Sequence, residues 1–307
     1  MRQLRRVVSS RNRRRVEYVA EDVAYLTHGF VNVYFLGRPG ERWVLVDTGL
    51  PMTAGRTLRA AAEVFGTPPE AIILTHGHVD HAGAVDELSR FWRVPVFAHR
   101  LELPYLRGLS DYPPRDSSMG GAIAHLARLL PTTGINLGRR VRALPDEGSI
   151  PGADGWRWIH TPGHTPGHIS LFRDSDRVLI AGDAVATTDL DSWRDVLAER
   201  PSIDRPAAPF TTDWDAARAS VRALLTLRPA VVGAGHGVPV SGPEIVPALR
   251  ALATDFPFPK RGRYLTQPAK ADASGVIEVP PAVIDPYPRI ILGAALAAFG
   301  ATMALRR

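Results

Sequence analysis

The chain has 307 residues, of which 45% are hydrophobic and 22% are charged, a composition typical of a globular protein rather than a disordered or fibrous one. It contains no cysteine, which excludes a disulfide framework, a Cys-ligated zinc or iron–sulfur site and a thiol nucleophile. Any bound metal must therefore be held by His, Asp or Glu.

The net charge of +6 is concentrated at the N-terminus. Residues 1–15 contain seven arginines and no acidic residue, which leaves 30 basic residues against 31 acidic ones for the rest of the chain. The body is thus near neutral, and a groove that follows a phosphate backbone is not indicated. We predict that residues 1–15 form a solvated basic arm. The arm lacks the apolar stretch of a secretory signal, so we expect a cytoplasmic location.

The first third of the chain alternates between strand and helix patterns. Short apolar runs separated by turn residues predict an antiparallel meander over residues 16–47. Apolar side chains at helical spacing predict a helix over 53–65, with Thr53 as a candidate cap. A fully apolar strand at 71–74 then precedes a polar loop and a helix at 84–92. This alternation favours an α/β arrangement.

The remaining elements continue the same alternation. We predict strands at 156–160, 169–172, 178–181 and 230–232, and helices at 122–130, 213–227 and 243–256. One domain is expected from residue 16 to residue 264.

The two halves of this domain contain the same order of strands and polar residues. In each half, one apolar strand precedes an Asp and a later one precedes a His: Asp47 and His76 in the first half, Asp183 and His236 in the second. If the strands run parallel, these side chains gather at their carboxyl ends, where open α/β sheets place their sites.

The strongest motif is His-x-His-x-Asp-His over residues 76–81, directly after an apolar strand. Three imidazoles and a carboxylate within six residues cannot all face one point from a helix or a strand, whereas a loop can direct them to two adjacent points. Imidazole and carboxylate are ligands that zinc, iron and manganese accept. A surface loop with solvated histidines is the alternative interpretation. It fits poorly, because further residues of the same kind follow downstream: His164, His168, Asp183 and His236.

This motif and the ordered His, Asp and His that follow it resemble the metallo-β-lactamase-fold hydrolase superfamily, over roughly residues 16–256. The resemblance implies an αββα sandwich, with two mixed β-sheets face to face and helices outside. It also implies two divalent metal ions, most simply Zn²⁺, with iron or manganese as alternatives. The implied ligands of the first ion are His76, His78 and His164, those of the second are Asp80, His81 and His236, and Asp183 bridges the two.

Several further residues are expected to have roles other than metal binding. Asp47, in the Val-Asp-Thr-Gly turn, matches a family position that we interpret as orienting a ligand imidazole. His168 matches the second His of a glyoxalase-type Thr-Pro-Gly-His-Thr-Pro-Gly-His element and is expected to be structural. His28 lies at a predicted hairpin tip, where it either borders the pocket or is solvated. The expected pocket walls are Tyr34, Tyr105, Tyr112 and the loop 187–210.

The resemblance implies hydrolysis of a small ester, thioester or lactone. A hydroxide shared by the two ions would attack the carbonyl carbon, with Asp80 orienting it. The glyoxalase-type element is closer to hydroxyacylglutathione hydrolases and lactonases than to β-lactamases, several of which use a Cys. A phosphodiesterase is less favoured because the body is near neutral, so no nucleic-acid partner is expected. A mononuclear persulfide dioxygenase, a non-hydrolytic oxidoreductase, would need only the first three histidines.

The C-terminal residues have a different composition. Residues 265–289 contain five prolines and are predicted to form an extended linker. Residues 290–305 are apolar apart from Thr302, and as a helix they would span about 24 Å, less than the roughly 30 Å hydrocarbon core of a membrane. We predict a helix over 290–307. It either associates with a membrane, or packs on the body or on a second copy of the chain in a homodimer.

Overall fold

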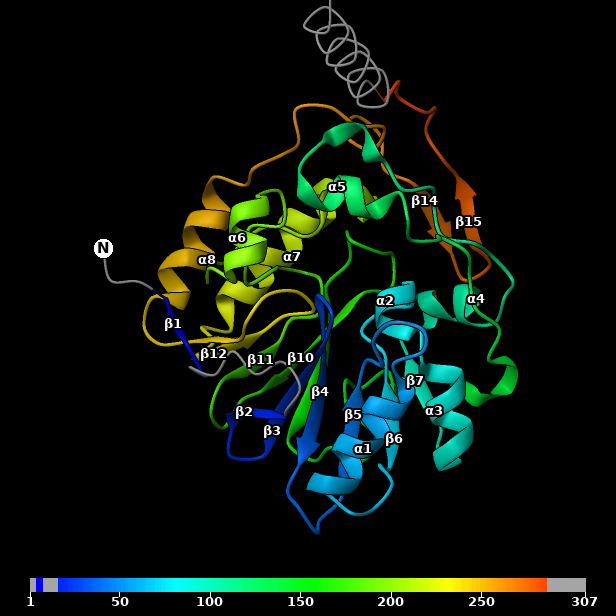
Figure 1. Cartoon of the computed structure of the whole chain (residues 1–307). Coiled ribbons are helices and arrows are strands. Elements are labelled where there is room, and N and C mark those ends of the chain that lie inside the picture. Colours follow the sequence, from blue (N-terminus) through cyan, green and yellow to red (C-terminus); the bar gives the residue numbers. More distant parts are fainter. Residues whose placement is uncertain (1–3, 8–15, 286–307) are drawn as a thin grey trace, which may run out of the picture.

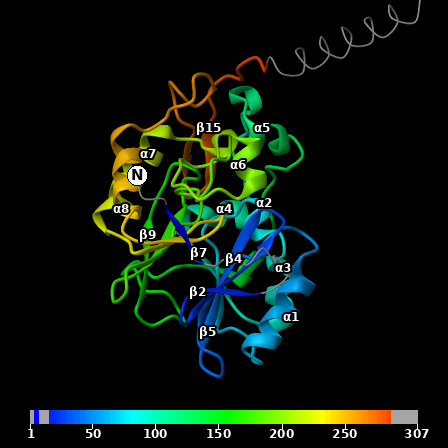
Figure 2. The same cartoon turned by 60° about the vertical axis from the view of Figure 1, so that its left-hand side comes forward.

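The computed structural model describes residues 4–7 and 16–285, and within them two β-sheets lie face to face between two groups of helices (Figures 1 and 2). Helices α1 (Ala54–Val64) and α3 (Val85–Trp92) lie on one side, and α7 (Trp214–Thr226) and α8 (Ile245–Thr254) on the other. Apolar clusters fill the space between each helix pair and its sheet and between the two sheets. This order of layers confirms the predicted αββα sandwich.

The first sheet, which packs against α1 and α3, has seven strands in the described part of the chain. In spatial order they are β2 (Glu17–Ala20), β3 (Val23–His28), β4 (Val31–Gly37), β5 (Trp43–Val46), β6 (Ala71–Ile73), β7 (Val96–Ala98) and β8 (Val141–Ala143). Strands β2 to β5 form the predicted antiparallel meander, and β5 to β8 run parallel. Helices α1 and α3 connect the parallel strands, and the buried Trp43 and Phe65 rings stack with centroids 4.3 Å apart.

The second sheet, which packs against α7 and α8, has six strands within the described residues. In spatial order they are β1 (Arg5–Arg6), β13 (Val240–Ser241), β12 (Val231–Gly233), β11 (Val178–Ile180), β10 (Ile169–Arg173) and β9 (Trp156–His160). Only β11 and β12 are parallel neighbours among these six strands. Strand β1 corrects part of the predicted solvated arm, because Arg5 and Arg6 pair with β13 at the edge of the sheet. Residues 1–3 and 8–15 lie outside the described residues.

The connections contain short helices and one hairpin. The short elements are α2 (Val79–Ala82), α4 (Leu103–Leu106), α5 (Ala122–Ala127), α6 (Trp193–Ala198), the 3₁₀ helices η1 (Arg100–Glu102), η2 (Ser117–Met119), η3 (Gly138–Arg140) and η4 (Ala208–Phe210), and the hairpin strands β14 (Lys270–Asp272) and β15 (Gly275–Glu278). The hairpin corrects the prediction of an extended linker for residues 270–278. It contacts the loop after α4, where the Val276 N–H donates to Ser110 Oγ at 3.1 Å.

The predicted C-terminal helix over 290–307 lies outside the described residues. Among the helices that the structure does describe, none combines the length and the apolar character needed to cross a membrane.

Candidate metal centre

Two of the parallel strand pairs, one in each sheet, explain why the sequence repeats its pattern of Asp and His. Asp47 follows β5 and His76 follows β6, its parallel neighbour in the first sheet. Asp183 follows β11 and His236 follows β12, its parallel neighbour in the second sheet. These four residues are therefore delivered from the carboxyl ends of two parallel pairs, as open α/β sheets do at their sites.

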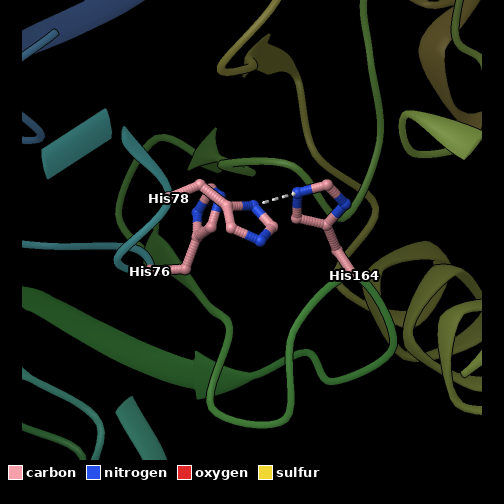
Figure 3. Close-up of side chains that lie close together, drawn as sticks. All are labelled: His76, His78 and His164. Atoms are coloured by element: carbon pink, nitrogen blue, oxygen red, sulfur yellow. Dashed lines mark hydrogen bonds between the residues drawn. The ribbon is translucent and has the colours of Figure 1, made fainter. Parts of the chain in front are cut away.

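The loop after β6 and the loop between β9 and β10 bring three imidazoles together. His76 and His78 extend from the first loop, and His164 faces them from the second (Figure 3). His78 Nδ1 and His164 Nε2 are 3.0 Å apart, and the centroid of the His76 ring is 4.7 and 4.9 Å from those of the other two rings. All three side chains are buried.

Two carboxylates and two further imidazoles lie close to these three rings. Asp80 and His81 come from α2, which begins immediately after His78. Asp183 Oδ1 is 3.4 Å from His81 Nε2, and its Oδ2 is 3.1 Å from His236 Nε2 and 3.5 Å from His164 Nε2. Asp80 Oδ2 is 3.5 Å from His236 Nε2 and 3.9 Å from His81 Nε2. The Asp183 carboxylate thus faces histidines from three separate loops.

The ring nitrogens that face away from this cluster are held by hydrogen bonds. His81 Nδ1 donates to Asp47 Oδ2 at 2.8 Å, His236 Nδ1 donates to the Phe30 carbonyl at 2.9 Å, and His164 Nδ1 lies 3.4 Å from Thr211 Oγ1. Such contacts fix the tautomer of an imidazole and aim its other nitrogen. Three Nε2 atoms are therefore directed into the cluster.

Asp47 holds the ring of His81 and the start of the loop that follows β6. Besides His81, it accepts hydrogen bonds from the Thr75 N–H and the Thr75 hydroxyl, both at 2.8 Å. Its backbone has a φ of 59°, in the left-handed region that Asp tolerates better than most residues. Asp47 thereby links the ends of β5 and β6 to the ring of His81.

His168 lies behind Asp183, outside the groups of clustered ligand atoms. The Asp183 N–H donates to His168 Nε2 at 2.8 Å, and His168 Nδ1 is 3.1 Å from the Thr161 carbonyl oxygen. Burial lowers the pKa of His168 to about 3, so the ring is neutral at pH 7. The ring then carries its proton on Nδ1 and positions the Asp183 backbone.

The protonation of the clustered histidines differs between the two sides. Burial lowers the pKa values of His76 and His164, and it lowers the pKa of His78 to about 4. These three rings therefore present neutral nitrogen lone pairs. Burial also acts to lower the pKa values of His81 and His236, but Asp183 and Asp80 outweigh it and raise both. The cluster thus joins a neutral nitrogen-rich half to a half that contains the carboxylates.

The donor set fits divalent metal ions. Among the described residues, His76 Nε2, His81 Nε2 and Asp183 Oδ1 are buried and have no hydrogen-bond partner, a costly state for polar atoms unless something else compensates it. Each of these atoms belongs to a residue in a set of three whose ligand atoms lie within 4.8 Å of one another. The sets are His76, His78 and His164; His76, His81 and Asp183; and Asp80, His81 and His236.

The sequence profile of the metallo-beta-lactamase superfamily matches residues 26–236. The chain belongs to this superfamily. YflN, a probable metallo-hydrolase of Bacillus subtilis (strain 168), is 46% identical over 239 residues, which cover 76% of this chain and 90% of YflN. The hydroxyacylglutathione hydrolase GloC of Haemophilus influenzae is 29% identical over 118 residues, which cover 38% of this chain and 50% of GloC.

A solved structure shows the same fold. A beta-lactamase domain protein from Burkholderia ambifaria has a TM-score of 0.58 and 24% identity, over 82% of this chain and 79% of that one. The chain is therefore a member of a metallo-hydrolase superfamily with a cluster of His and Asp residues suited to metal ions.

Only some of the residues predicted to form the pocket walls lie beside the histidine cluster. The Tyr112 and Phe210 rings lie beside His78, with centroids at 4.6 and 5.4 Å. Tyr105 stacks behind Tyr112 at 4.0 Å, and Tyr34 is buried with its hydroxyl donating to the Ala234 carbonyl at 2.7 Å. Tyr112 and the end of the 187–210 loop therefore border the site, whereas the other two tyrosines lie a layer further in.

The structure corrects the solvated alternative for His28 and adds residues that the motifs did not reveal. His28 is only 1% exposed, and its Nε2 is 2.9 Å from Thr57 Oγ1. Thr53 occupies the cap position of α1, but its hydroxyl donates to the Leu50 carbonyl instead of capping the helix. Thr211 and Glu102 contact the histidine loops, yet neither lies in a pattern that marks it in the sequence.

Proposed function

We propose that this chain is a dinuclear metallo-hydrolase that cleaves an ester, thioester or lactone bond in a small molecule. The observation that carries the proposal is the convergence of seven buried His and Asp side chains into three sets that share members. The middle set shares His76 with one outer set and His81 with the other, so the ligand atoms form one continuous cluster. A cluster of this kind suits two neighbouring ions.

The ligands divide between two ions. His76 Nε2, His78 Nδ1 and His164 Nε2 would hold the first, and Asp80, His81 Nε2 and His236 Nε2 would hold the second. Asp183 would bridge them, because its two oxygens face histidines of both groups at 3.1–3.5 Å. A single-ion dioxygenase would have no need for the second group, which supports hydrolysis. Zinc suits this set of nitrogen and oxygen donors, and iron and manganese accept the same ligands.

When bound, the two ions would supply Lewis-acid polarisation of the substrate carbonyl and a water acidic enough to react at neutral pH. Asp80 and His78 are the most exposed members of the cluster, at 8% and 7%. Substrate therefore approaches on their side, between Asp80 and the rings of Tyr112 and Phe210. There the Asp80 carboxylate orients the attacking water.

A recess beside His236 supports a small substrate. It has a volume of about 140 Å³, and its lining includes the apolar side chains of Phe30, Leu190, Val196 and Leu197. A space of this size and character accommodates a short apolar group of an acyl or alcohol portion. The similarity to the hydroxyacylglutathione hydrolase GloC supports a thioester among the candidate substrates.

The proposal is tested with the purified, metal-reconstituted protein and a matched panel of thioester, lactone, carboxylic ester, β-lactam and phosphodiester substrates. We expect turnover of the thioester, lactone or carboxylic ester that is lost in Asp183→Ala. Turnover of the phosphodiester or the β-lactam alone, or ester-type hydrolysis that persists in Asp183→Ala, would overturn the proposal. Measurement of bound metal in both proteins separates a failed ligand assignment from a failed substrate class.

A further inference from the structure

Glu102 is a completely buried carboxylate that the proposed function does not use. It ends η1, which follows β7, and it leads directly into α4. An acid in the interior is costly unless hydrogen bonds compensate the loss of water. Its contacts therefore indicate why the chain has an acid at this position.

Each of the two carboxylate oxygens of Glu102 accepts two hydrogen bonds. Oε1 accepts from the Thr165 hydroxyl at 2.7 Å and from the Gly167 N–H at 2.9 Å. Oε2 accepts from the Gly77 N–H at 3.0 Å and from the Tyr112 hydroxyl. All four donors are neutral groups, and together they occupy the lone pairs of both carboxylate oxygens.

Each oxygen accepts a backbone hydrogen bond from a different histidine loop. Gly77 lies between His76 and His78, so Oε2 is bonded to the first loop. Thr165 directly follows His164, and Gly167 directly precedes His168, so Oε1 is bonded to the second loop. One carboxylate thus spans the two loops that carry the three-histidine group.

The close approach of these loops to Glu102 leaves no room for side chains at the two glycines. A Cβ atom on Gly167 would lie 2.8 Å from the Glu102 backbone nitrogen and from its Oε1. A Cβ atom on Gly77 would lie 2.5 Å from the Tyr112 hydroxyl oxygen. The absence of a side chain at both positions therefore lets the backbone reach the carboxylate and its hydroxyl partner.

We propose that Glu102 is the positioning residue that sets the separation of the two histidine loops and thereby the affinity of the three-histidine group for its metal ion. The inference rests on the proposed metal centre. Loss of either oxygen's hydrogen bonds frees one loop, so His164 no longer stays aligned with His76 and His78. Outer partners of this kind affect metal binding by orienting the ligands.

The key variant is Glu102→Gln, because a glutamine side chain has nearly the same shape as a glutamate side chain. An amide NH₂ group cannot accept from a backbone N–H, so whichever loop faces it loses the acceptor that residue 102 provides, while the other loop keeps it. Glu102→Ala removes both acceptors. The matched control is Asp116→Asn, because Asp116 is also a buried carboxylate that accepts from two backbone N–H groups, those of Ser118 and Arg263, outside the histidine loops.

The affinity for Zn²⁺ is measured by competition with a chelator, and the ligand geometry by the absorption spectrum of the Co²⁺-loaded protein. We expect Glu102→Gln to weaken the affinity by roughly 10–100-fold and to change the Co²⁺ spectrum. Asp116→Asn should lower the melting temperature while both metal readouts stay at wild-type values. Wild-type readouts in Glu102→Gln, or an equal loss in Asp116→Asn, would overturn the inference.

Two milder variants keep the test decisive if the Glu102 variants do not fold. Tyr112→Phe removes a donor from Oε2, together with an acceptor that the Gly77 N–H contacts at 2.9 Å. Thr165→Val removes a donor from Oε1. Each should weaken Zn²⁺ binding by up to about tenfold, and unchanged affinity in both would contradict the proposed role. If wild-type protein binds no metal, the proposed function fails with it; if wild-type protein binds two ions and the variants bind equally well, only the role of Glu102 fails.

Discussion

The two aspartates that follow the parallel strand pairs have equivalent positions in the two sheets but different surroundings. Both oxygens of Asp47 accept hydrogen bonds, from Thr75 and from His81. Asp183, after the corresponding strand of the second sheet, has a buried Oδ1 with no hydrogen-bond partner among the described residues, and its carboxylate faces three histidines. The position after a parallel strand therefore brings both acids to the site. Asp47 uses both oxygens in hydrogen bonds and can only orient a neighbouring residue, whereas Asp183 has an oxygen left that can contact a metal ion.

The largest effect is expected at Asp183. Asp183→Ala removes the proposed bridging ligand, so turnover should fall by more than the roughly 100-fold typical of losing an outer partner of a ligand. The check is kcat on the best substrate of the panel, at saturating metal. Equal turnover in the variant and the wild type would remove the distinction between the two aspartates.

A smaller effect is expected at Asp47. Asp47→Asn keeps a residue that tolerates the left-handed backbone, but it replaces an acceptor of the His81 or Thr75 hydrogen bonds by an amide. Metal affinity should fall by roughly 10–100-fold while the ligand set stays complete. Chelator competition measures this change, and a loss of one whole ion in Asp47→Asn would show that Asp47 itself is a ligand.

A still smaller effect on metal is expected at His168. His168→Leu leaves the Asp183 N–H without its acceptor, which should cost about 1–3 kcal/mol of unfolding free energy. Metal affinity should fall by no more than about tenfold, because the Asp183 side chain is kept. Denaturant unfolding and chelator competition on the same samples check the two numbers, and complete loss of an ion would identify His168 as a ligand.

A substitution in the helix layer outside the first sheet is expected to leave the metal centre unchanged. Phe65→Ala removes a ring that stacks on Trp43 and should lower the unfolding free energy by about 3–5 kcal/mol. Metal stoichiometry and affinity of the folded variant should remain those of the wild type. A parallel fall in metal affinity would show that the site depends on the whole sheet and not on its loops.

Local patterns in the sequence predicted the strand and helix alternation and the clustered residues, whereas the αββα layers were implied by the resemblance to the superfamily. The strands over 23–28 and 31–37 and the helices over 54–64 and 214–226 have clear apolar periodicity, and the His-x-His-x-Asp-His motif has a fixed spacing. The motif also marks the residues that the fold later brings together, since each follows a strand end. Elements with this much local information could be predicted without the structure.

The remaining features depend on contacts between distant residues. Glu102 lies in an unremarkable Arg-Leu-Glu-Leu-Pro stretch, and its partners Gly77 and Thr165 are 25 and 63 residues away. The hairpin over 270–278 was obscured by the prolines around it, and it is held against Ser110, 166 residues from Val276. Short strands such as Arg5–Arg6 pair only because a partner edge is available. Periodicity carries no signal for such contacts.

The most direct test of the two-ion centre is the metal content per folded chain, measured by elemental analysis on wild-type protein and on Asp183→Ala after reconstitution and removal of free metal. We predict two ions per chain in the wild type and fewer than two in Asp183→Ala, with both proteins folded. Two ions in the variant, or no more than one in the wild type, would contradict the bridging role of Asp183 and the dinuclear centre built on it.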